Sequence, residues 1–185
     1  MFPNFNKSNF LLSKFAPIIF FTIVFFVYLS IGILKKEGII LGSDEYTLNY
    51  VLDGDTIDVS QYGKSYRVRY IGIDTPEIDH PQQGKVGQCY GNEAKSFNEK
   101  LLKSAKKLKL VKDKTDKDVY GRLLRYVYID NIFVNEEIIK NGYAYVLNIP
   151  PNSSLKDTFE NAKNTAKDNN KGVWVYCAYE DKRAK

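Results

Sequence analysis

An uncharged, strongly apolar run near the N-terminus divides this chain of 185 residues into a short N-terminal part and a much longer C-terminal part. The run covers residues 15–34 and is rich in Phe, Ile and Val. Such a run is long enough to cross a bilayer as a helix, and it lacks the polar face of a surface helix. We therefore expect a basic tail at 1–14, a single membrane-spanning helix at 15–34 and a linker at 35–44.

A cleaved signal peptide is the competing interpretation, because Lys7 and Lys14 precede the apolar run. The run exceeds the usual apolar core of a signal peptide, and residues 28–34 offer no clean small-x-small cleavage site. Lys35 and Lys36 lie beyond the run, so the distribution of positive charge only slightly favours an N-terminus on the cytoplasmic side of the membrane. We expect the rest of the chain to lie outside the cytoplasm, attached to the cell membrane, with secretion after cleavage as the alternative.

The net charge of +5 is weak evidence for a nucleic-acid partner. Residues 44–185 contain 23 basic and 21 acidic side chains, so most of the excess belongs to the N-terminal segment. The remaining length and the hydrophobic content of 44% suit one packed domain. We place this domain at 45–178, followed by a short tail at 179–185.

Alternating apolar residues and turn residues predict a β-meander at the start of the domain. The expected strands are 45–52, 56–60 and 65–73, with a hairpin turn at 61–64. A long loop rich in Pro and Gly follows at 74–91, and long loops in compact domains are often functional.

Helical spacing appears only after this loop. We expect helices at 92–106, 134–141 and from 155 towards Gly172, and further strands at 108–112 and 122–129. The residues at 143–147 are either a short strand or irregular. Five strands and three helices in this order favour an α+β domain built on a small closed barrel, rather than a parallel sheet.

Carboxylates gather where the predicted strands meet loops. Asp55 begins one strand and Asp74 ends a neighbouring one, so pairing of these strands would bring the two carboxylates together. With the Thr75 carbonyl, and Glu77 directly or through water, they supply enough oxygens for Ca²⁺. Taken alone, the motif around Asp55 is better explained as an ordinary turn, and the one around Asp74 as the end of a strand.

Two arginines change that balance. Arg69 lies on the same predicted strand as Asp74, and Arg122 opens a later strand. A phosphodiester under attack gains negative charge, which two guanidinium groups can stabilise. Glu77 is placed to orient or deprotonate a water. The pattern predicts metal-assisted phosphodiester hydrolysis.

Five separated motifs in this order resemble the staphylococcal nuclease family, also called thermonucleases. They are Asp-Gly-Asp-Thr at 53–56, Arg-Tyr-Ile-Gly-Ile-Asp-Thr-Pro-Glu at 69–77, Tyr-Gly-Asn-Glu-Ala at 90–94, Asp-Val-Tyr-Gly-Arg at 118–122 and Gly-Val-Trp at 172–174. The resemblance implies an OB-fold, a five-stranded barrel with three helices. It also implies a Ca²⁺-dependent endonuclease, a hydrolase of ester bonds that cuts DNA and RNA and leaves 3′-phosphorylated products. We expect a monomer without a protein partner.

The resemblance also implies roles for individual residues. Asp55, Asp74 and the Thr75 carbonyl would bind calcium, Arg69, Glu77 and Arg122 would be catalytic, and Tyr120 would contact a phosphate. The nucleotide pocket departs from the family, which has two tyrosines before a Pro-Asn turn where this chain has Asn148 and Pro150. Tyr143 and Tyr145 are alternative stacking residues, although core packing is their expected role.

Cys89 and Cys177 are the two cysteines, and in an exported domain a disulfide is the simplest expectation. Free buried thiols are the alternative. A zinc site that adds His80 to them lacks the paired spacing of such sites, and a Ser-His-Asp hydrolase lacks its nucleophile elbow. A non-catalytic OB module that binds single strands or a protein is the other functional alternative, although binding alone has no use for the full catalytic set.

Overall fold

The computed structural model describes residues 45–84 and 86–177, which belong to one compact unit, Asp44–Lys185. The predicted N-terminal tail, membrane segment and linker, and the predicted C-terminal tail, lie outside the described residues. Among the residues that the structure describes, no helix is both long and apolar enough to cross a membrane.

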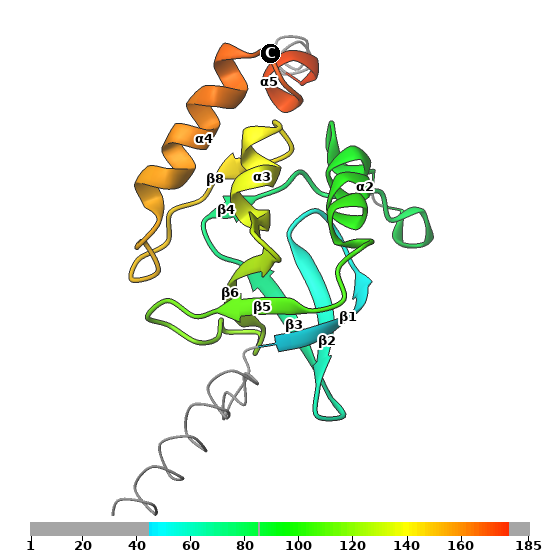
Figure 1. Ribbon diagram of the computed structural model, residues 1–185. Helices are drawn as coiled ribbons and strands as arrows, with labels where there is room; N and C mark the ends of the chain where they lie inside the picture. The colour runs from blue at the N-terminus through cyan, green and yellow to red at the C-terminus, as the bar shows by residue number, and fades with distance from the viewer. Residues whose placement is uncertain (1–44, 85, 178–185) are drawn as a thin grey trace, which may run out of the picture. The chain divides into compact units, whose positions relative to one another are not determined.

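Five strands form a closed barrel (Figure 1). They are β1 (Glu45–Val51), β2 (Thr56–Gln61), β3 (Lys64–Tyr70), β5 (Leu108–Val111) and β6 (Leu123–Ile129). The first three form the predicted antiparallel meander, and β5 pairs antiparallel with both β1 and β6. Parallel pairing of β3 with β6, with Arg69 opposite Leu124, closes the barrel. This barrel carrying helices is consistent with the predicted OB-fold.

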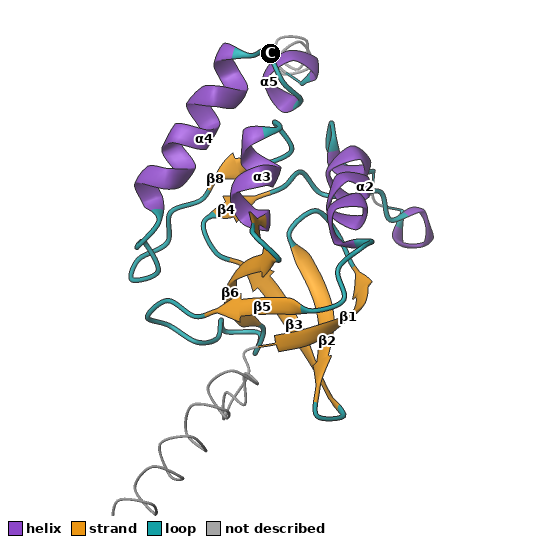
Figure 2. Cartoon of the chain, in the orientation of Figure 1, coloured by secondary structure: helices purple, strands orange, loops and turns teal. Residues whose placement is uncertain are grey.

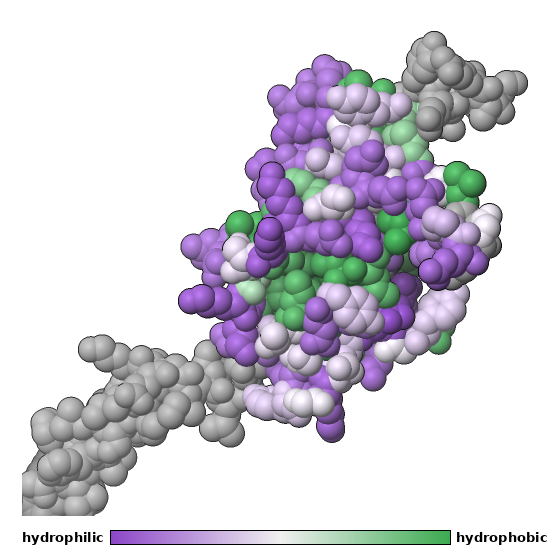
Figure 3. Space-filling model, turned by 90° about the vertical axis from the view of Figure 1, so that its right-hand side faces the viewer, coloured by the Kyte–Doolittle hydropathy of each residue, from purple (hydrophilic) through white to green (hydrophobic). Residues whose placement is uncertain are grey.

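The inward faces of these strands supply the core, because alternate residues of a strand point to the same side. Ile57 and Val59 of β2, Val68 of β3 and Val127 of β6 are fully buried. Hydrophilic residues cover much of the face shown in Figure 3, with apolar residues gathered at its centre. Packing of these buried side chains inside the barrel fixes the positions of the strands that carry the candidate site.

The prediction of one unbroken strand at 65–73 is wrong. Strand β3 ends at Tyr70, and a separate short strand, β4 (Ile73–Asp74), pairs with β8 (Tyr145–Val146). Between them Gly72 has φ +82°, and an added Cβ would lie 2.0 Å from Cε2 of Phe159. The close approach of Phe159 breaks the strand, so Asp74 does not share a strand with Arg69.

The three predicted helices are present, at one end of the barrel (Figure 2). They are α2 (Gly91–Leu102), α3 (Val134–Lys140) and α4 (Lys156–Asp168). Helix α2 ends short of its predicted end at residue 106, where the amide of Ala105 donates to the carbonyl of Leu102 in a tight turn toward β5. The structure adds the short elements η1 (Pro81–Gln83), β7 (Ile132–Phe133) and α5 (Val173–Tyr176).

Candidate active site

Asp55 is the buried centre of the candidate site, in the loop before β2. Its Oδ2 accepts hydrogen bonds from the Thr75 amide at 2.8 Å and the Thr75 hydroxyl at 3.0 Å. Its Oδ1 accepts from the Thr56 hydroxyl at 3.1 Å and lies 3.1 Å from Nε of Arg69. Only 5% of Asp55 is exposed, so this carboxylate fastens the β1–β2 loop to the segment after β4.

Gly54 allows this contact. A Cβ at position 54 would lie 2.6 Å from Cγ2 of Thr75, closer than nonbonded carbon atoms approach. The glycine of the Asp-Gly-Asp-Thr motif therefore makes room for the side chain that Asp55 binds.

Arg69 lies between the two predicted metal-binding carboxylates. Its Nε faces Asp55, and its Nη2 lies 2.8 Å from Oδ1 of Asp74. Its Nη1 donates to the carbonyls of Tyr70 and Ile73, at 3.0 and 2.8 Å. The structure thus brings Asp55 and Asp74 to one guanidinium group, even though Asp74 lies on a separate strand, and Thr75 joins them through its hydrogen bonds to Asp55.

These oxygens suit a hard cation. Burial raises the pKa of Asp55 to about 6, although the charge of Arg69 acts to lower it, so this desolvated carboxylate gains from further positive charge. Asp74 has a side chain that is 56% exposed, and its Oδ2 makes no recorded hydrogen bond within the described part of the chain. Carboxylate and carbonyl oxygens are the ligands that Ca²⁺ takes, with water completing the shell.

The side chains alone do not provide a complete set of metal ligands in the part of the chain that the structure describes. Within residues 45–84 and 86–177, no group of three or more His, Cys, Asp or Glu side chains could hold a metal ion. The predicted set has two carboxylates and one backbone carbonyl, so it depends on water for the rest of its ligands.

Glu77 presents an exposed carboxylate beside this centre in the chain. Its backbone is held by Gln88, whose Oε1 accepts from the Glu77 amide at 2.9 Å and whose amide donates to the Glu77 carbonyl at 2.8 Å. Its carboxylate makes no recorded hydrogen bond or ion pair with the residues that the structure describes. The side chain is therefore available to a water or a substrate.

Cys89 and Cys177 form a disulfide, with their Cα atoms 5.7 Å apart. The bond links the residue after Gln88 to the end of α5. It also leaves neither sulfur as a thiolate, so the zinc alternative with His80 is wrong.

Arg122 is held by a residue to which the sequence motif assigned no role. Its Nε donates to Oδ2 of Asp118 at 2.6 Å, while the amides of Tyr120 and Arg122 donate to Oδ1 at 3.0 and 2.9 Å. Burial acts to raise the pKa of Asp118, but these hydrogen bonds and the charge of Arg122 hold it below its usual value. Asp118 therefore stays ionised and fixes the direction of Arg122.

Arg69, Tyr120 and Arg122 line one cavity of about 400 Å³. The parallel register explains this meeting, because Arg69 lies opposite Leu124, two residues beyond Arg122. Glu77 is not among the lining residues. The structure brings together both predicted catalytic arginines and the predicted phosphate-contacting tyrosine.

Part of the cavity wall is aliphatic. Leu147, Ile149 and Pro150 line it, while Asn148 does not. Tyr143 stacks on Phe97 and Tyr90, with ring centroids 4.2 and 5.3 Å away. Tyr145 meets Trp174 edge to face at 5.3 Å. Neither tyrosine lines this cavity. Tyr143 packs against the core as expected, whereas Tyr145 is 41% exposed, so the expectation of core packing is wrong for Tyr145.

Comparisons with known proteins show which proteins this chain resembles. The family described as Staphylococcal nuclease homologue matches residues 67–176. The chain is 41% identical to endonuclease YncB of Bacillus subtilis (strain 168) over 135 residues, which cover 72% of this chain and 63% of YncB. It is 40% identical to the SPbeta prophage-derived endonuclease YokF of the same strain over 137 residues, covering 73% and 45%.

A thermonuclease of Staphylococcus hyicus is 36% identical over 144 residues, which cover 77% of this chain and 83% of the thermonuclease. The chain thus spans less than two thirds of the two Bacillus proteins and most of the staphylococcal one. Both the match to the family and the coverage of the thermonuclease lead to one conclusion: the chain belongs to the staphylococcal nuclease family.

Proposed function

We propose that this chain is a Ca²⁺-dependent nuclease that hydrolyses phosphodiester bonds of DNA and RNA and leaves 3′-phosphorylated products. One observation carries the proposal: two arginines and a tyrosine line a single cavity, next to a pair of carboxylates that share one of those arginines. Relatives named endonuclease and thermonuclease support the same activity.

The arginines bind the phosphate of the bond that is cut. The hydrogen bond of Arg122 to Asp118 uses Nε, which leaves its two terminal nitrogens to the phosphate oxygens. Arg69 contacts Asp74, the more exposed of its two carboxylate partners, and a phosphate oxygen replaces this contact more readily than the buried one with Asp55. Both groups stabilise the charge that grows on the phosphate during attack.

Glu77 orients or deprotonates the attacking water. Its exposed carboxylate has no partner within the described residues, and a general base needs such access to a proton. Gln88 and the neighbouring disulfide hold its backbone, which limits the movement of the base.

Asp55, Asp74 and the Thr75 carbonyl would hold Ca²⁺. When bound, the ion supplies positive charge that neutralises the phosphate. The part of the cavity lined by Leu147, Ile149 and Pro150 contacts a base through apolar surface, which does not read hydrogen-bonding edges. This composition supports cleavage of both DNA and RNA with little base preference.

We place this activity outside the cytoplasm, with the chain anchored by residues 15–34 or secreted after cleavage, and we expect a monomer. The Cys89–Cys177 disulfide supports this location, because disulfides persist in oxidising compartments. Carbonate extraction and N-terminal sequencing of the mature protein test the anchor. A new terminus near residue 35 would show that the chain is secreted.

The direct test of the reaction uses the full chain in mild detergent. Single-stranded DNA, duplex DNA and RNA are each incubated with Ca²⁺ or with a chelator, and the product ends are mapped by mass spectrometry. We expect Ca²⁺-dependent cleavage with terminal 3′-phosphates. Binding without cleavage in Ca²⁺ would overturn the nuclease and support the OB binding module.

A further inference from the structure

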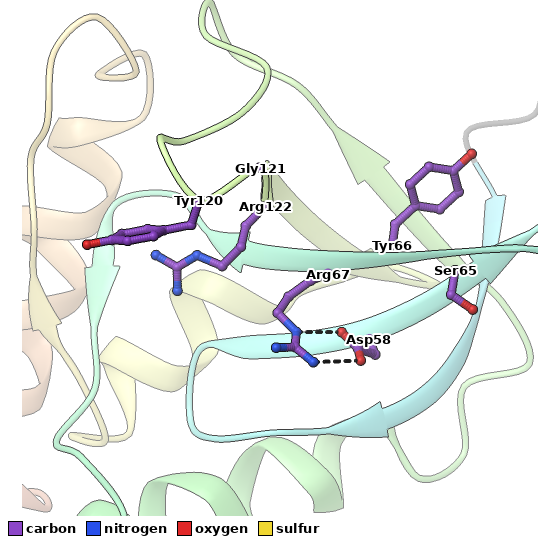
Figure 4. Close-up of a pocket in the computed structure, with 7 residues that line it drawn as sticks. All are labelled: Asp58, Ser65, Tyr66, Arg67, Tyr120, Gly121 and Arg122. Atoms are coloured by element: carbon purple, nitrogen blue, oxygen red, sulfur yellow. Dashed lines mark hydrogen bonds and ion pairs between the residues drawn. The ribbon is translucent and has the colours of Figure 1, made fainter.

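A second open cavity, of about 370 Å³, borders the first. It is lined by Asp58, Ser65, Tyr66, Arg67, Tyr120, Gly121 and Arg122 (Figure 4). Tyr120 and Arg122 line both cavities, so the two spaces meet at the arginine that is proposed to bind the scissile phosphate. A strand that crosses Arg122 therefore has a cavity on each side of it.

Three arginines connect the two cavities: Arg69 lines the first, Arg67 lines the second and Arg122 lines both. Arg67 and Arg69 are two residues apart on β3, so they project from the same face, about 7 Å apart along the strand. Val68 pairs with Leu123 in the parallel ladder of β3 and β6. Arg67 and Arg122 each come one residue before this pair, so they lie at matching positions of neighbouring segments. This spacing suits successive phosphates of an extended single strand.

Arg67 is held in place while part of its guanidinium group remains available. Its Nε and Nη2 lie 2.9 and 3.1 Å from the two carboxylate oxygens of Asp58, as the dashed lines in Figure 4 show. Nη2 also lies 3.5 Å from the hydroxyl of Tyr50. Nη1 makes no recorded hydrogen bond within the described part of the chain, and 48% of the side chain is exposed.

The pair stays charged. Hydrogen bonding from Arg67 holds the pKa of Asp58 below its usual value. A surface ion pair of this kind contributes little to stability, and many such pairs serve only as solvated surface. What distinguishes Arg67 is its position in a cavity beside Arg122, with a planar donor group already oriented by Asp58.

An exposed aromatic ring lies beside the two arginines. Figure 4 shows Tyr120 beside Arg122 at one end of the cavity, whereas Tyr66, at the other end, points away from Arg67. The Tyr66 ring packs against the core and meets Tyr46 edge to face at 6.0 Å. Tyr120 is 81% exposed, and the guanidinium carbon of Arg122 lies 5.5 Å from the centre of its ring. Grooves that combine cationic donors with exposed aromatic faces are typical of sites for single-stranded nucleic acid, because every base can stack on a ring.

We propose that this cavity is a second nucleotide subsite, which binds the nucleotide next to the scissile phosphate of single-stranded DNA or RNA. Nη1 of Arg67 donates to an oxygen of the neighbouring phosphodiester, and a base stacks on Tyr120. The position of the subsite relative to the cut bond rests on the proposed nuclease function, but its binding can be measured without cleavage.

The test measures binding of the full chain in mild detergent with chelator present. A fluorescent single-stranded hexanucleotide occupies both cavities, whereas a nucleoside 3′,5′-bisphosphate can fill only one. Arg67→Gln should weaken hexanucleotide binding about tenfold and leave the bisphosphate far less affected, because one charged hydrogen bond is lost. The slope of log K against log salt should fall in magnitude by about 0.7.

Two variants control for folding and for charge. Arg67→Lys keeps the charge but not the planar fork, so it should restore the salt slope while recovering only part of the affinity. Lys163→Gln removes a cation that pairs with Glu160 on α4, and it should change neither quantity.

The outcomes separate this proposal from the nuclease function. An unchanged hexanucleotide Kd in Arg67→Gln, equal weakening for both ligands, or the same loss in Lys163→Gln would overturn the subsite. If the wild-type chain shows the expected binding pattern but cleaves nothing in Ca²⁺, the subsite stands and the nuclease proposal fails. If the wild-type chain cleaves in Ca²⁺ but Arg67→Gln binds the hexanucleotide normally, the nuclease proposal stands and the subsite fails.

Discussion

Nε of Arg69 lies 3.1 Å from Oδ1 of Asp55, and both side chains are largely buried. Arg69 also reaches Asp74, whose side chain is 56% exposed. One guanidinium group thus joins a buried carboxylate, which fastens two loops, to an exposed one, which does not. The two predicted calcium ligands therefore differ in what they do for the fold.

Asp55→Ala should lower the free energy of unfolding by about 3 kcal/mol, because it leaves Arg69 and the donors of Thr75 without their buried partner. Asp74→Ala is the matched control and should cost less than about 1 kcal/mol, as an exposed ion pair does. Urea unfolding measures both. Equal losses would contradict the different roles of the two carboxylates.

Asp118→Asn should reduce kcat/KM about tenfold, because Arg122 loses the charged acceptor that directs it. In an Arg122→Gln background the same substitution should cause no further loss, since Asp118 acts through Arg122. Asp116→Asn, which removes the carboxylate partner of Arg125, is the control and should leave kcat/KM unchanged. Additive losses in the double variant would show that Asp118 acts independently of Arg122.

The Cys89–Cys177 disulfide closes a loop with a sequence separation of 88. A double Cys→Ser variant at these positions should lose about 2–4 kcal/mol of stability, and reductant should lower the urea midpoint of the wild-type chain in the same direction. A midpoint that does not respond to reductant would show that the bond contributes nothing to folding.

We expect Asp113 to make stability depend on pH in the acid range. Burial acts to raise its pKa, but hydrogen bonds from Ser154, at 2.8 and 3.1 Å, and from Tyr126, at 2.8 Å, outweigh it and hold the pKa below 3.8. The stabilisation from a lowered pKa is complete above the unfolded value and disappears as the pH falls through the folded value. Asp113→Asn should therefore cost about 1 kcal/mol at pH 7 and progressively less below pH 3.8.

Urea unfolding at several pH values measures this difference. Asp168→Asn, at the exposed end of α4, removes the same charge and serves as the control. A cost of Asp113→Asn that stays constant, or grows, as the pH falls would contradict the assignment.

Local sequence pattern predicted most of the fold. Alternation in β1 to β3 and helical spacing in α2, α3 and α4 are properties of neighbouring residues, so they can be read directly. The break at Gly72 could not, because Phe159, from a distant helix, imposes it. The parallel pairing of Arg69 with Leu124, which closes the barrel, also joins residues far apart in the sequence.

Part of the candidate site could also be predicted from the sequence. Acidic and basic residues at strand ends indicated Asp55, Asp74 and Arg69, whose contacts the structure shows. The positioning of Arg122 by Asp118 depends on the conformation of a loop, and the Asp58–Arg67 pair depends on strand register. Neither leaves a pattern in the sequence. The roles of Glu77, Tyr120 and the calcium ligands stay predictions, as does the membrane segment.

In the proposed mechanism, Glu77 acts on the water that attacks a phosphate held by Arg69 and Arg122. Cleavage of single-stranded DNA by the wild-type chain and by Glu77→Gln, with Ca²⁺ or chelator, tests it most directly. We predict cleavage by the wild type in Ca²⁺ alone and a loss of about 10²- to 10⁴-fold in the variant, with unfolding and oligonucleotide binding unchanged. Full activity of Glu77→Gln, or equal cleavage in chelator, would contradict the claim.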